Sequence, residues 1–234
     1  YYLLWAGGPI PEHLGYSMSQ SPTGPWKYAG TLMPTEGGSF TNHPGIIDYK
    51  GSTYLFYHNG ALPGGSGFTR SVCADKVTFN GDGTIRQMKM TDGIQEGLLP
   101  LNPYRKTEAE TMAYSEWMKS DANNEVGVFV NAMHDGAYTK VKGVDFGSKG
   151  AAKVTVRIGT THHSGVTMEV RADGIQGTLL ATLDVPMTGG DDRWALVTTD
   201  VAGIKGVHDL YFVCKGNKPG RLMYFDYWMF HRRK

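Results

Sequence analysis

Two short runs in the first third of the chain contain the residues best suited to chemistry. They are Ser39–Ile47 (SFTNHPGII) and His58–Val72 (HNGALPGGSGFTRSV). Arg70 in the second run carries a planar fork of hydrogen-bond donors, and the glycine-rich stretch 60–67 beside it favours a ligand pocket. His43 in the first run offers two ring nitrogens. Read alone, His43 before Pro44 fits a turn histidine that caps a strand, and Arg70 fits an exposed strand arginine.

Glu12 and His13 stand in a loop of the same region and could touch the same ligand, although such side chains are often only solvated. The glycine-rich Pro63–Gly65 is not followed by a helical pattern, so the sequence does not predict a phosphate-binding loop. A net charge of +1 gives no electrostatic footprint for nucleic acid, and the one basic run is His231–Lys234 at the end. No apolar run approaches the length of a membrane span.

The composition predicts which elements position these residues. With 32 Gly, 13 Tyr and 19% charged residues, the chain suits short strands and many turns, and we expect an all-β protein without helices. Cys73 and Cys214 lie in apolar, strand-like runs, where buried free thiols are the expected state.

A degenerate repeat of about 52 residues organises the first ninety residues. Its members pair Tyr2–Trp5 with Tyr54–Tyr57, Gly15–Ser17 with Phe68–Ser71, and Trp26–Leu32 with Phe79–Ile85. The period suits four-stranded propeller blades, and two blades alone would leave open edges, so we expect missing partner blades. Tyr1–Trp5 reads as the middle of a buried strand, so we expect the chain to begin inside a domain. The alternative is a single small meander with accidental similarity.

The blade pattern stops at Gly97–Lys106, which contains two prolines. We therefore expect an incomplete propeller over 1–96, a linker over 97–106 and a β-sandwich over 107–234. The sandwich should hold about eight to ten short strands separated by turn residues. Those expected from the pattern include Tyr138–Val141, Ala152–Ile158, Thr167–Arg171, Leu179–Val185, Trp194–Val201 and Val207–Lys215.

With Gly7–Ser19 and Ser21–Trp26, the two runs described first resemble the last blades of glycoside hydrolase family 43, over residues 1 to about 100. Members are five-bladed propellers that act on arabinose- and xylose-containing plant polysaccharides, and the likeness is to their arabinofuranosidase and xylosidase branch. The resemblance implies an inverting mechanism with an Asp base, a Glu acid and a second Asp. All three precede the strand that resembles Tyr1–Trp5, so no catalytic residue is expected in this chain.

The same resemblance implies roles for two residues that are present, His43 and Arg70. His43 matches a histidine on the propeller axis that contacts calcium directly or through water. Arg70 matches an arginine that hydrogen-bonds the hydroxyls of the terminal sugar. Glu12 lies at the corresponding end of its blade and could touch the substrate.

Residues 107–230 resemble carbohydrate-binding module family 6, a jelly-roll β-sandwich. The matching motifs are Glu108–Glu110, Gly143–Phe146, Thr188–Gly190, Gly206–Leu210 and Phe225–Trp228. The resemblance implies a structural calcium held by Glu108, Glu110 and Asp226, where the first and last strands meet. The alternative is that these three are exposed charges at strand ends.

The usual sugar site of that family, at one end of the sandwich, uses two aromatic residues and an asparagine. The matching positions here hold Ala132, Asp191 and Tyr224. We therefore expect this end site to be disabled. The module would then pack against the propeller or bind glycan on its concave sheet face. Tyr138 and Trp117 are fallback surface aromatics, while Trp194 and Trp228 match core positions.

Two functional hypotheses follow. The first is part of a secreted or periplasmic, bacterial-type glycoside hydrolase on arabinoxylan or xylan, an α-L-arabinofuranosidase or β-xylosidase whose missing N-terminal blades complete it. The second is a non-catalytic fragment that acts as a glycan-binding or structural spacer module. A lectin-like or sialidase-like propeller would need repeated Asp-box turns, which the sequence lacks.

Overall fold

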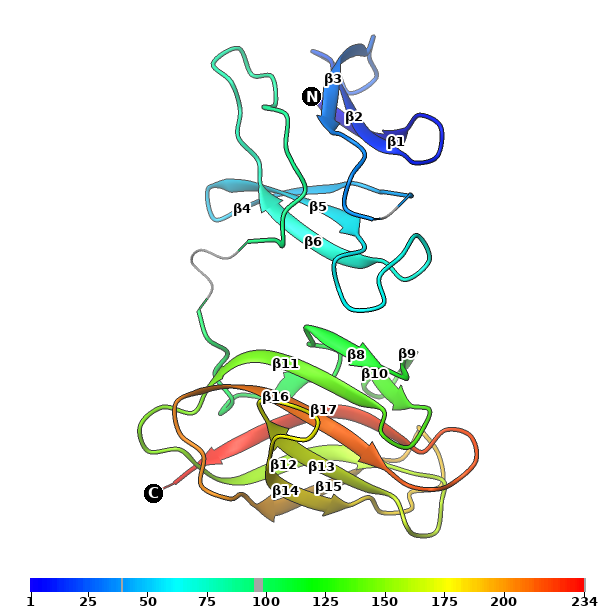
Figure 1. Ribbon diagram of the computed structural model, residues 1–234, viewed down its shortest axis with the longest axis vertical. Helices are drawn as coiled ribbons and strands as arrows, with labels where there is room; N and C mark the ends of the chain where they lie inside the picture. Colours follow the sequence, from blue (N-terminus) through cyan, green and yellow to red (C-terminus); the bar gives the residue numbers. More distant parts are fainter. Residues whose placement is uncertain (39, 95–98, 234) are drawn as a thin grey trace. The chain divides into compact units, whose positions relative to one another are not determined.

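The computed structural model describes residues 1–38, 40–94 and 99–233, and the chain divides into two compact units, Tyr1–Leu98 and Leu99–Lys234. Every regular element in the described ranges is a β-strand, which confirms the all-β prediction (Figure 1). Within those ranges no helix is long and apolar enough to cross a membrane.

The first unit contains two three-stranded antiparallel sheets. Their strands are β1 (Tyr2–Gly7), β2 (His13–Met18) and β3 (Lys27–Met33), then β4 (Gly45–Tyr49), β5 (Ser52–Asn59) and β6 (Ser71–Lys76). The repeat predicted from the sequence matches β1 with β5, whereas its second member, Phe68–Ser71, overlaps β6 only at Ser71. Its third member, Phe79–Ile85, forms only one β-bridge, so neither sheet reaches the expected four strands within the described residues.

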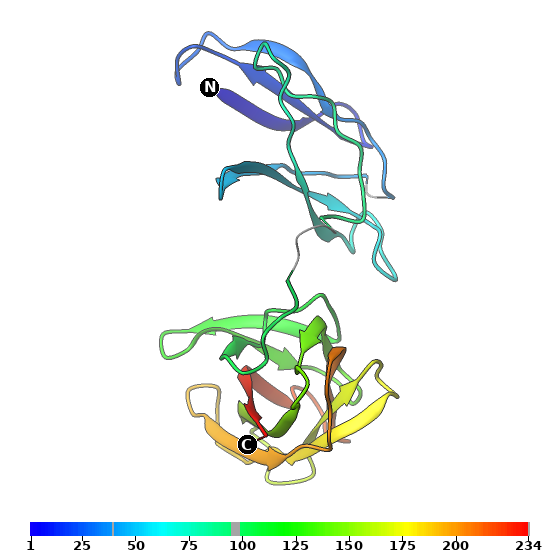
Figure 2. The same ribbon diagram turned by 90° about the vertical axis from the view of Figure 1, so that its left-hand side faces the viewer.

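The two sheets of this unit share one apolar core. Leu14 and Leu32 of the first sheet and Leu55 of the second are fully buried within it. The segment after β6 runs beside both sheets, where Met88 N donates to Leu32 O at 2.7 Å and Ile94 N donates to Ala74 O at 2.9 Å (Figure 2). This segment therefore ties the two blades together.

Strand β1 forms where the sequence predicts it, and within these two blades its apolar side chains are partly exposed. Tyr2 is 40% exposed and Leu3 is 45% exposed. The reason is that β1 lies at the edge of its sheet, and within the described residues no further strand pairs with that edge. An apolar strand is expected to be covered by other residues, but its sequence does not show which part of the protein covers it.

The second unit is a sandwich of two antiparallel sheets (Figure 1). The larger has the order β15-β12-β17-β10-β9 with β7 beside β17, and the smaller has the order β14-β13-β16-β11-β8. The strands are β7 (Thr107–Glu108), β8 (Tyr114–Glu116), β9 (Met118–Asn123), β10 (Gly127–Ala132), β11 (Tyr138–Asp145), β12 (Ala151–Gly159), β13 (Thr167–Ala172), β14 (Thr178–Asp184), β15 (Ala195–Asp200), β16 (Val207–Lys215) and β17 (Met223–Arg232). These eleven described strands exceed the eight to ten expected.

Alternating apolar residues of the two sheets meet in a single core. Trp228 is fully buried there, as predicted, whereas Trp194 is only half-buried and packs against Phe129 and Tyr224. Cys73 and Cys214 are buried free thiols in their respective units, which confirms that prediction.

Part of the stretch predicted as a linker, 97–106, packs on the sandwich. Residues 97 and 98 lie outside the described residues. Leu101 forms a parallel bridge with Val144, and the Tyr104 hydroxyl donates to Phe146 O at 2.7 Å. The second unit therefore includes residues from Leu99 onward.

Candidate functional site

The residues predicted to bind substrate in the first unit converge on the segment 40–43. The Glu12 main-chain N donates to Phe40 O at 3.0 Å, and its carboxylate Oε2 accepts from Asn42 N, also at 3.0 Å. Glu12 thus fixes the path of this segment, which is a positioning task. Its carboxylate is already engaged within the protein.

The buried side chain of Asn42 anchors the segment 40–43. It is 1% exposed, and its Oδ1 accepts from His58 N at 2.9 Å, where strand β5 nears its end. Its side-chain nitrogen lies 4.0 Å from Met33 Sδ. A buried amide with such partners holds the backbone in one conformation, so Thr41 and His43 are presented from a fixed base.

Arg70 reaches the same segment from the loop before β6. Its Nη1 donates to Thr41 Oγ1 at 2.7 Å, and its side chain is otherwise exposed. A guanidinium has more donors than this bond uses, so it can also hydrogen-bond a ligand. Gly67 permits the approach of the two loops because a Cβ at this position would overlap the Phe40 ring.

His58 belongs to this site, although the sequence analysis did not single it out. Its ring lies 5.8 Å from the ring of His43, and its Nδ1 is buried without a hydrogen-bond partner. Burial is the main cause that lowers the pKa of His58, and the neighbouring Arg70 and His43 lower it further. His58 therefore stays neutral near pH 7 and keeps a lone pair for a ligand. Its place at the start of the HNG run was the available sequence signal.

The carboxylates predicted to bind calcium come from β7, from the residues just after it and from β17, which pairs with β7. Glu108 pairs with Tyr227 across the two strands, and Ala109 N donates to Asp226 O at 2.7 Å. Each of the three carboxylates has one buried oxygen without a hydrogen-bond partner: Glu108 Oε2, Glu110 Oε2 and Asp226 Oδ1. Uncompensated buried carboxylate oxygens are costly, and a cation would satisfy them.

Electrostatics at this cluster are only partly balanced. Burial raises the pKa of Asp226, while the nearby charges of Arg157 and Lys106 lower it. Lys106 Nζ lies 2.8 Å from Glu108 Oε1. Within the ranges that the structure covers, no three His, Cys, Asp or Glu side chains already surround a common point, so the cluster is not a pre-assembled metal cage.

The end of the sandwich that would hold a sugar is filled by protein. Tyr224 is fully buried, and its hydroxyl is hydrogen-bonded to Thr188 Oγ1. Gly159 lies against the Tyr224 ring, where a Cβ would come within 2.5 Å of Cε2. Arg221 covers the other side, 5.2 Å from the ring centroid, and bonds Asp191 Oδ2 at 2.6 Å. The Tyr224 ring therefore offers no open face to a sugar.

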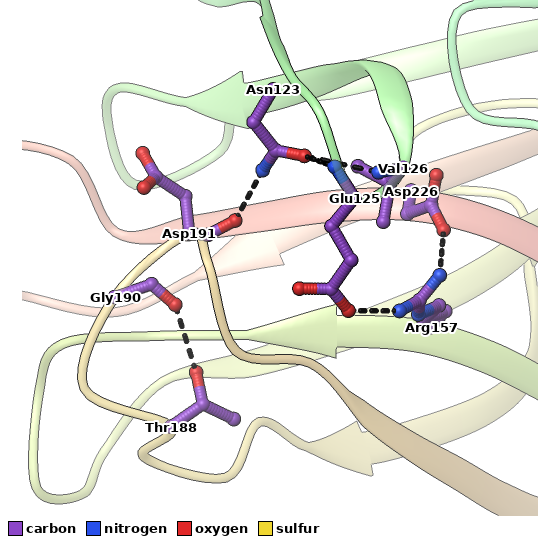
Figure 3. A network of polar contacts seen from close by, with 8 residues as sticks. All are labelled: Asn123, Glu125, Val126, Arg157, Thr188, Gly190, Asp191 and Asp226. Atoms are coloured by element: carbon purple, nitrogen blue, oxygen red, sulfur yellow. Dashed lines mark hydrogen bonds and ion pairs between the residues drawn. The ribbon is translucent and has the colours of Figure 1, made fainter.

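A network of polar contacts connects this end to the carboxylate cluster (Figure 3). Arg157 Nη1 lies 3.3 Å from Asp226 Oδ2, and its Nη2 donates to Glu125 Oε1 at 2.6 Å. Asn123 Nδ2 donates to Asp191 O at 2.6 Å. The turn between β9 and β10 therefore bridges the two regions.

Comparison with known families decides the assignment of both units. Residues 108–232 match the profile of "Carbohydrate binding module (family 6)", and residues 1–85 match "Glycosyl hydrolases family 43". The chain belongs to carbohydrate-binding module family 6, joined to a family 43 segment. Both resemblances expected from the motifs are confirmed.

Two curated relatives align with both units of the chain. The chain is 34% identical over 95% of its length to an arabinoxylan arabinofuranohydrolase of Bacillus subtilis, and it spans 46% of that protein. It is 32% identical over 93% of its length to an arabinoxylan arabinofuranohydrolase of Paenibacillus polymyxa, spanning 36% of it. The chain thus spans less than half of each of these relatives.

Solved structures agree with the family assignment. A family 43 arabinoxylan arabinofuranohydrolase from Bacillus subtilis, in complex with cellotetraose, superposes over the whole chain and 52% of that protein, with a TM-score of 0.78 and 32% identity. A family 6 module from Clostridium cellulolyticum in complex with xylose covers 56% of this chain and is matched along its full length, with a TM-score of 0.53 and 30% identity.

Proposed function

We propose that this chain supplies two blades and the appended module of a glycoside hydrolase that removes arabinose side chains from arabinoxylan. The observation that carries the proposal is the convergence of Arg70, His43 and His58 on one segment of a family 43 blade. The names of the relatives, which include a xylosidase/arabinosidase of Thermoclostridium stercorarium, support this substrate class. β-Xylosidase action on xylan ends is the alternative within it.

The proposed reaction is an inverting hydrolysis. It needs a carboxylic acid to protonate the leaving oxygen and an opposed carboxylate, about 6.5–9.5 Å away, to activate water. The family resemblance assigns Glu12 to neither role, and its Oε2 accepts from Asn42 N. The acid and base would therefore come from propeller blades outside these 234 residues. Because plant polysaccharides lie outside the cell, the enzyme would act as a secreted or periplasmic protein.

The proposed partner of the first unit is the remainder of the propeller. Leu3 on β1 is 45% exposed, Ile47 on β4 is 54% exposed and Phe56 on β5 is 43% exposed. Propellers bury such faces between neighbouring blades and leave only short, protected strand edges. Further blades would cover these side chains and complete the pocket that Arg70 borders.

A chimera tests the role of Arg70. Residues 1–98 would replace the matching segment of the Bacillus subtilis relative, which supplies the other blades. Arg70→Lys keeps the charge and removes the planar fork, so kcat/KM on arabinoxylan should fall at least about tenfold, the loss of one charged hydrogen bond. Arg86→Lys, at an exposed position, is the matched control and should leave activity unchanged. Equal activity of both variants would show that Arg70 does not bind the substrate.

We also propose that Glu108, Glu110 and Asp226 hold a structural calcium ion. The three buried oxygens without partners support it, as does the preference of calcium for carboxylate and carbonyl oxygens. On binding, the ion would draw the carboxylates together, and main-chain carbonyls would complete its shell. The ion would neutralise the repulsion among the three carboxylates, where the first and last strands of the sandwich meet. His43 would offer a second calcium contact on the propeller axis.

Chelation tests the structural ion. Calcium should raise the melting temperature of the chain after treatment with EGTA, because ligand binding to the folded state stabilises it. Glu110→Gln should abolish that increase, whereas Asp184→Asn, at an exposed strand end, should preserve it. A melting temperature independent of calcium would exclude the site.

Any glycan contact of the module is proposed for the outer face of the five-stranded sheet rather than for the closed end. Tyr138 lies between Tyr114 and Tyr211, with ring centroids 6.0 and 5.9 Å away. A row of aromatic rings suits the apolar faces of sugars. Trp117, which is 60% exposed and packs edge-on to His134, is the fallback position.

The second candidate function is a non-catalytic module, used for glycan binding or as a spacer. The second unit has its own large core and matches an isolated family 6 module along that module's full length. The chimera separates the two candidates, because a spacer would restore no hydrolysis to the blades of the relative.

A further inference from the structure

Arg157 stands between the carboxylate cluster and the turn that joins β9 to β10 (Figure 3). One end of its guanidinium contacts Asp226, which is 1% exposed, at 3.3 Å. The other end donates to the more exposed Glu125 at 2.6 Å. The guanidinium carbon also lies 5.6 Å from the Trp194 ring. Arg157 is therefore shared between two acidic partners.

The turn that contains Glu125 is tied to the loop at the end of the sandwich. Asn123 Oδ1 accepts from the main-chain N atoms of Glu125 and Val126, at 2.9 and 3.0 Å. The Asn123 side-chain nitrogen donates to Asp191 O at 2.6 Å. The side chain of Asn123 therefore connects the main chain at Glu125 to the loop around Asp191.

We propose that Arg157 couples cation binding at Glu108, Glu110 and Asp226 to the order of the β9–β10 turn and of the loop 188–192. The inference rests on the calcium site proposed above. Asp226 uses Oδ2 for Arg157 and has Oδ1 without a partner. A divalent cation on the same buried carboxylate repels the guanidinium, and this repulsion is strong where water is scarce. Binding of the cation thus weakens the contact of Arg157 with Asp226 and strengthens its existing contact with Glu125.

Two substitutions should act in opposite directions. Arg157→Met removes the positive charge that competes for Asp226, so calcium binds more tightly. Glu125→Gln removes the acceptor that draws Arg157 away from Asp226, so calcium binds more weakly. Damage to the fold would weaken binding in both variants. The opposite signs therefore distinguish coupling from a structural effect.

Isothermal titration of calcium into the chelator-treated 234-residue chain measures these affinities. We expect binding about fivefold tighter in Arg157→Met and about fivefold weaker in Glu125→Gln, the lower range of known coupling between sites. Arg171→Met is the matched control, because Arg171 makes an equivalent pair with Glu169 at 2.8 Å on the other sheet. Equal affinities in all variants, or weaker binding in both test variants, would overturn the coupling.

Hydrogen exchange gives the reciprocal measurement. Calcium should slow amide exchange at residues 123–126 and 188–192 in the wild-type chain and leave it unchanged there in Arg157→Met. Calcium binding without this difference would overturn the coupling and leave the site itself in place. No calcium binding to the wild-type chain would overturn the site and the coupling together.

Discussion

Arg221 Nη1 lies 2.6 Å from Asp191 Oδ2, and this ion pair closes the loops at one end of the sandwich. The same guanidinium covers the ring of Tyr224, and its Nη1 donates to Asn131 Oδ1 at 3.2 Å. Asp191 stands where the family 6 resemblance implies a tryptophan. Instead of an aromatic wall for a sugar, the chain thus places a carboxylate that is paired within the protein.

Asp191→Ala should leave the affinity of the chain for xylo-oligosaccharides unchanged, because the end site does not bind them. It should lower the free energy of unfolding by about 0.5–1 kcal/mol, the scale of a partly exposed ion pair. Urea denaturation and isothermal titration measure the two effects, with Asp192→Ala at an exposed neighbouring position as the control. Tight binding that Asp191→Ala or a change at Ala132 abolished would show that the end site is active.

Two tryptophans of the sandwich should differ sharply in their contribution to stability. Trp228 is fully buried between the sheets, so Trp228→Ala should cost about 3–5 kcal/mol of unfolding free energy. Trp117 is 60% exposed, so Trp117→Ala should cost less than about 0.5 kcal/mol. Chemical denaturation of the two variants compares them, and similar costs would contradict the assigned core.

Asn42→Ala should destabilise the first unit by about 1–3 kcal/mol, because it leaves a buried donor at His58 N without its acceptor. It should also release the segment that carries Thr41, and with it the bond from Arg70. In the chimera, kcat/KM should therefore fall in Asn42→Ala and remain normal in Asn80→Ala, a change in an exposed turn. Normal stability and activity in Asn42→Ala would refute its anchoring role.

His208 should make the stability of the second unit depend on pH. Its Nδ1 lies 2.7 Å from Asp173 Oδ2 and its Nε2 lies 2.8 Å from Lys205 O, so both nitrogens face acceptors. The hydrogen bond to Asp173 is the main cause that raises the pKa of His208 above 6.5. Its contribution is therefore fully present below the unfolded-state pKa and is lost as pH rises through the higher folded-state pKa.

Urea denaturation between about pH 6 and pH 8.5, across the histidine range, tests this dependence. The stability difference between wild type and His208→Asn should shrink as pH rises. His163→Asn, at an exposed position, should show no such trend. A stability difference that grew with pH would contradict the claim that the protonated form of His208 stabilises the fold.

Local sequence signals predicted much of the fold and of the first-unit site. The run that contains His43 and the run that contains Arg70 were recognisable as motifs, and the structure brings the two runs into contact. The repeat of Tyr2–Trp5 at Tyr54–Tyr57 predicted two related strands, β1 and β5. These features are encoded by neighbouring residues, so pattern reasoning reaches them.

Pairings between distant, ordinary charges were not predictable. Arg157 and Glu125 are 32 residues apart, and Arg221 and Asp191 are 30 apart, with no pattern that marks them as partners. The hydrogen bond of Glu12 was not predictable for the same reason, because its partner is a main-chain N–H on another loop. The partial exposure of β1 in these two blades was not predictable, because hydrophobicity does not reveal which surface a strand meets.

The central claim is that these blades complete an inverting, arabinose-releasing enzyme whose acid and base lie outside this chain. Time-resolved proton NMR of arabinoxylan with the chimera tests it most directly. With the chimera, we expect arabinose to appear first with inverted anomeric configuration. We expect the 234-residue chain alone to release no arabinose. Retained configuration, or arabinose release by the chain alone, would contradict it.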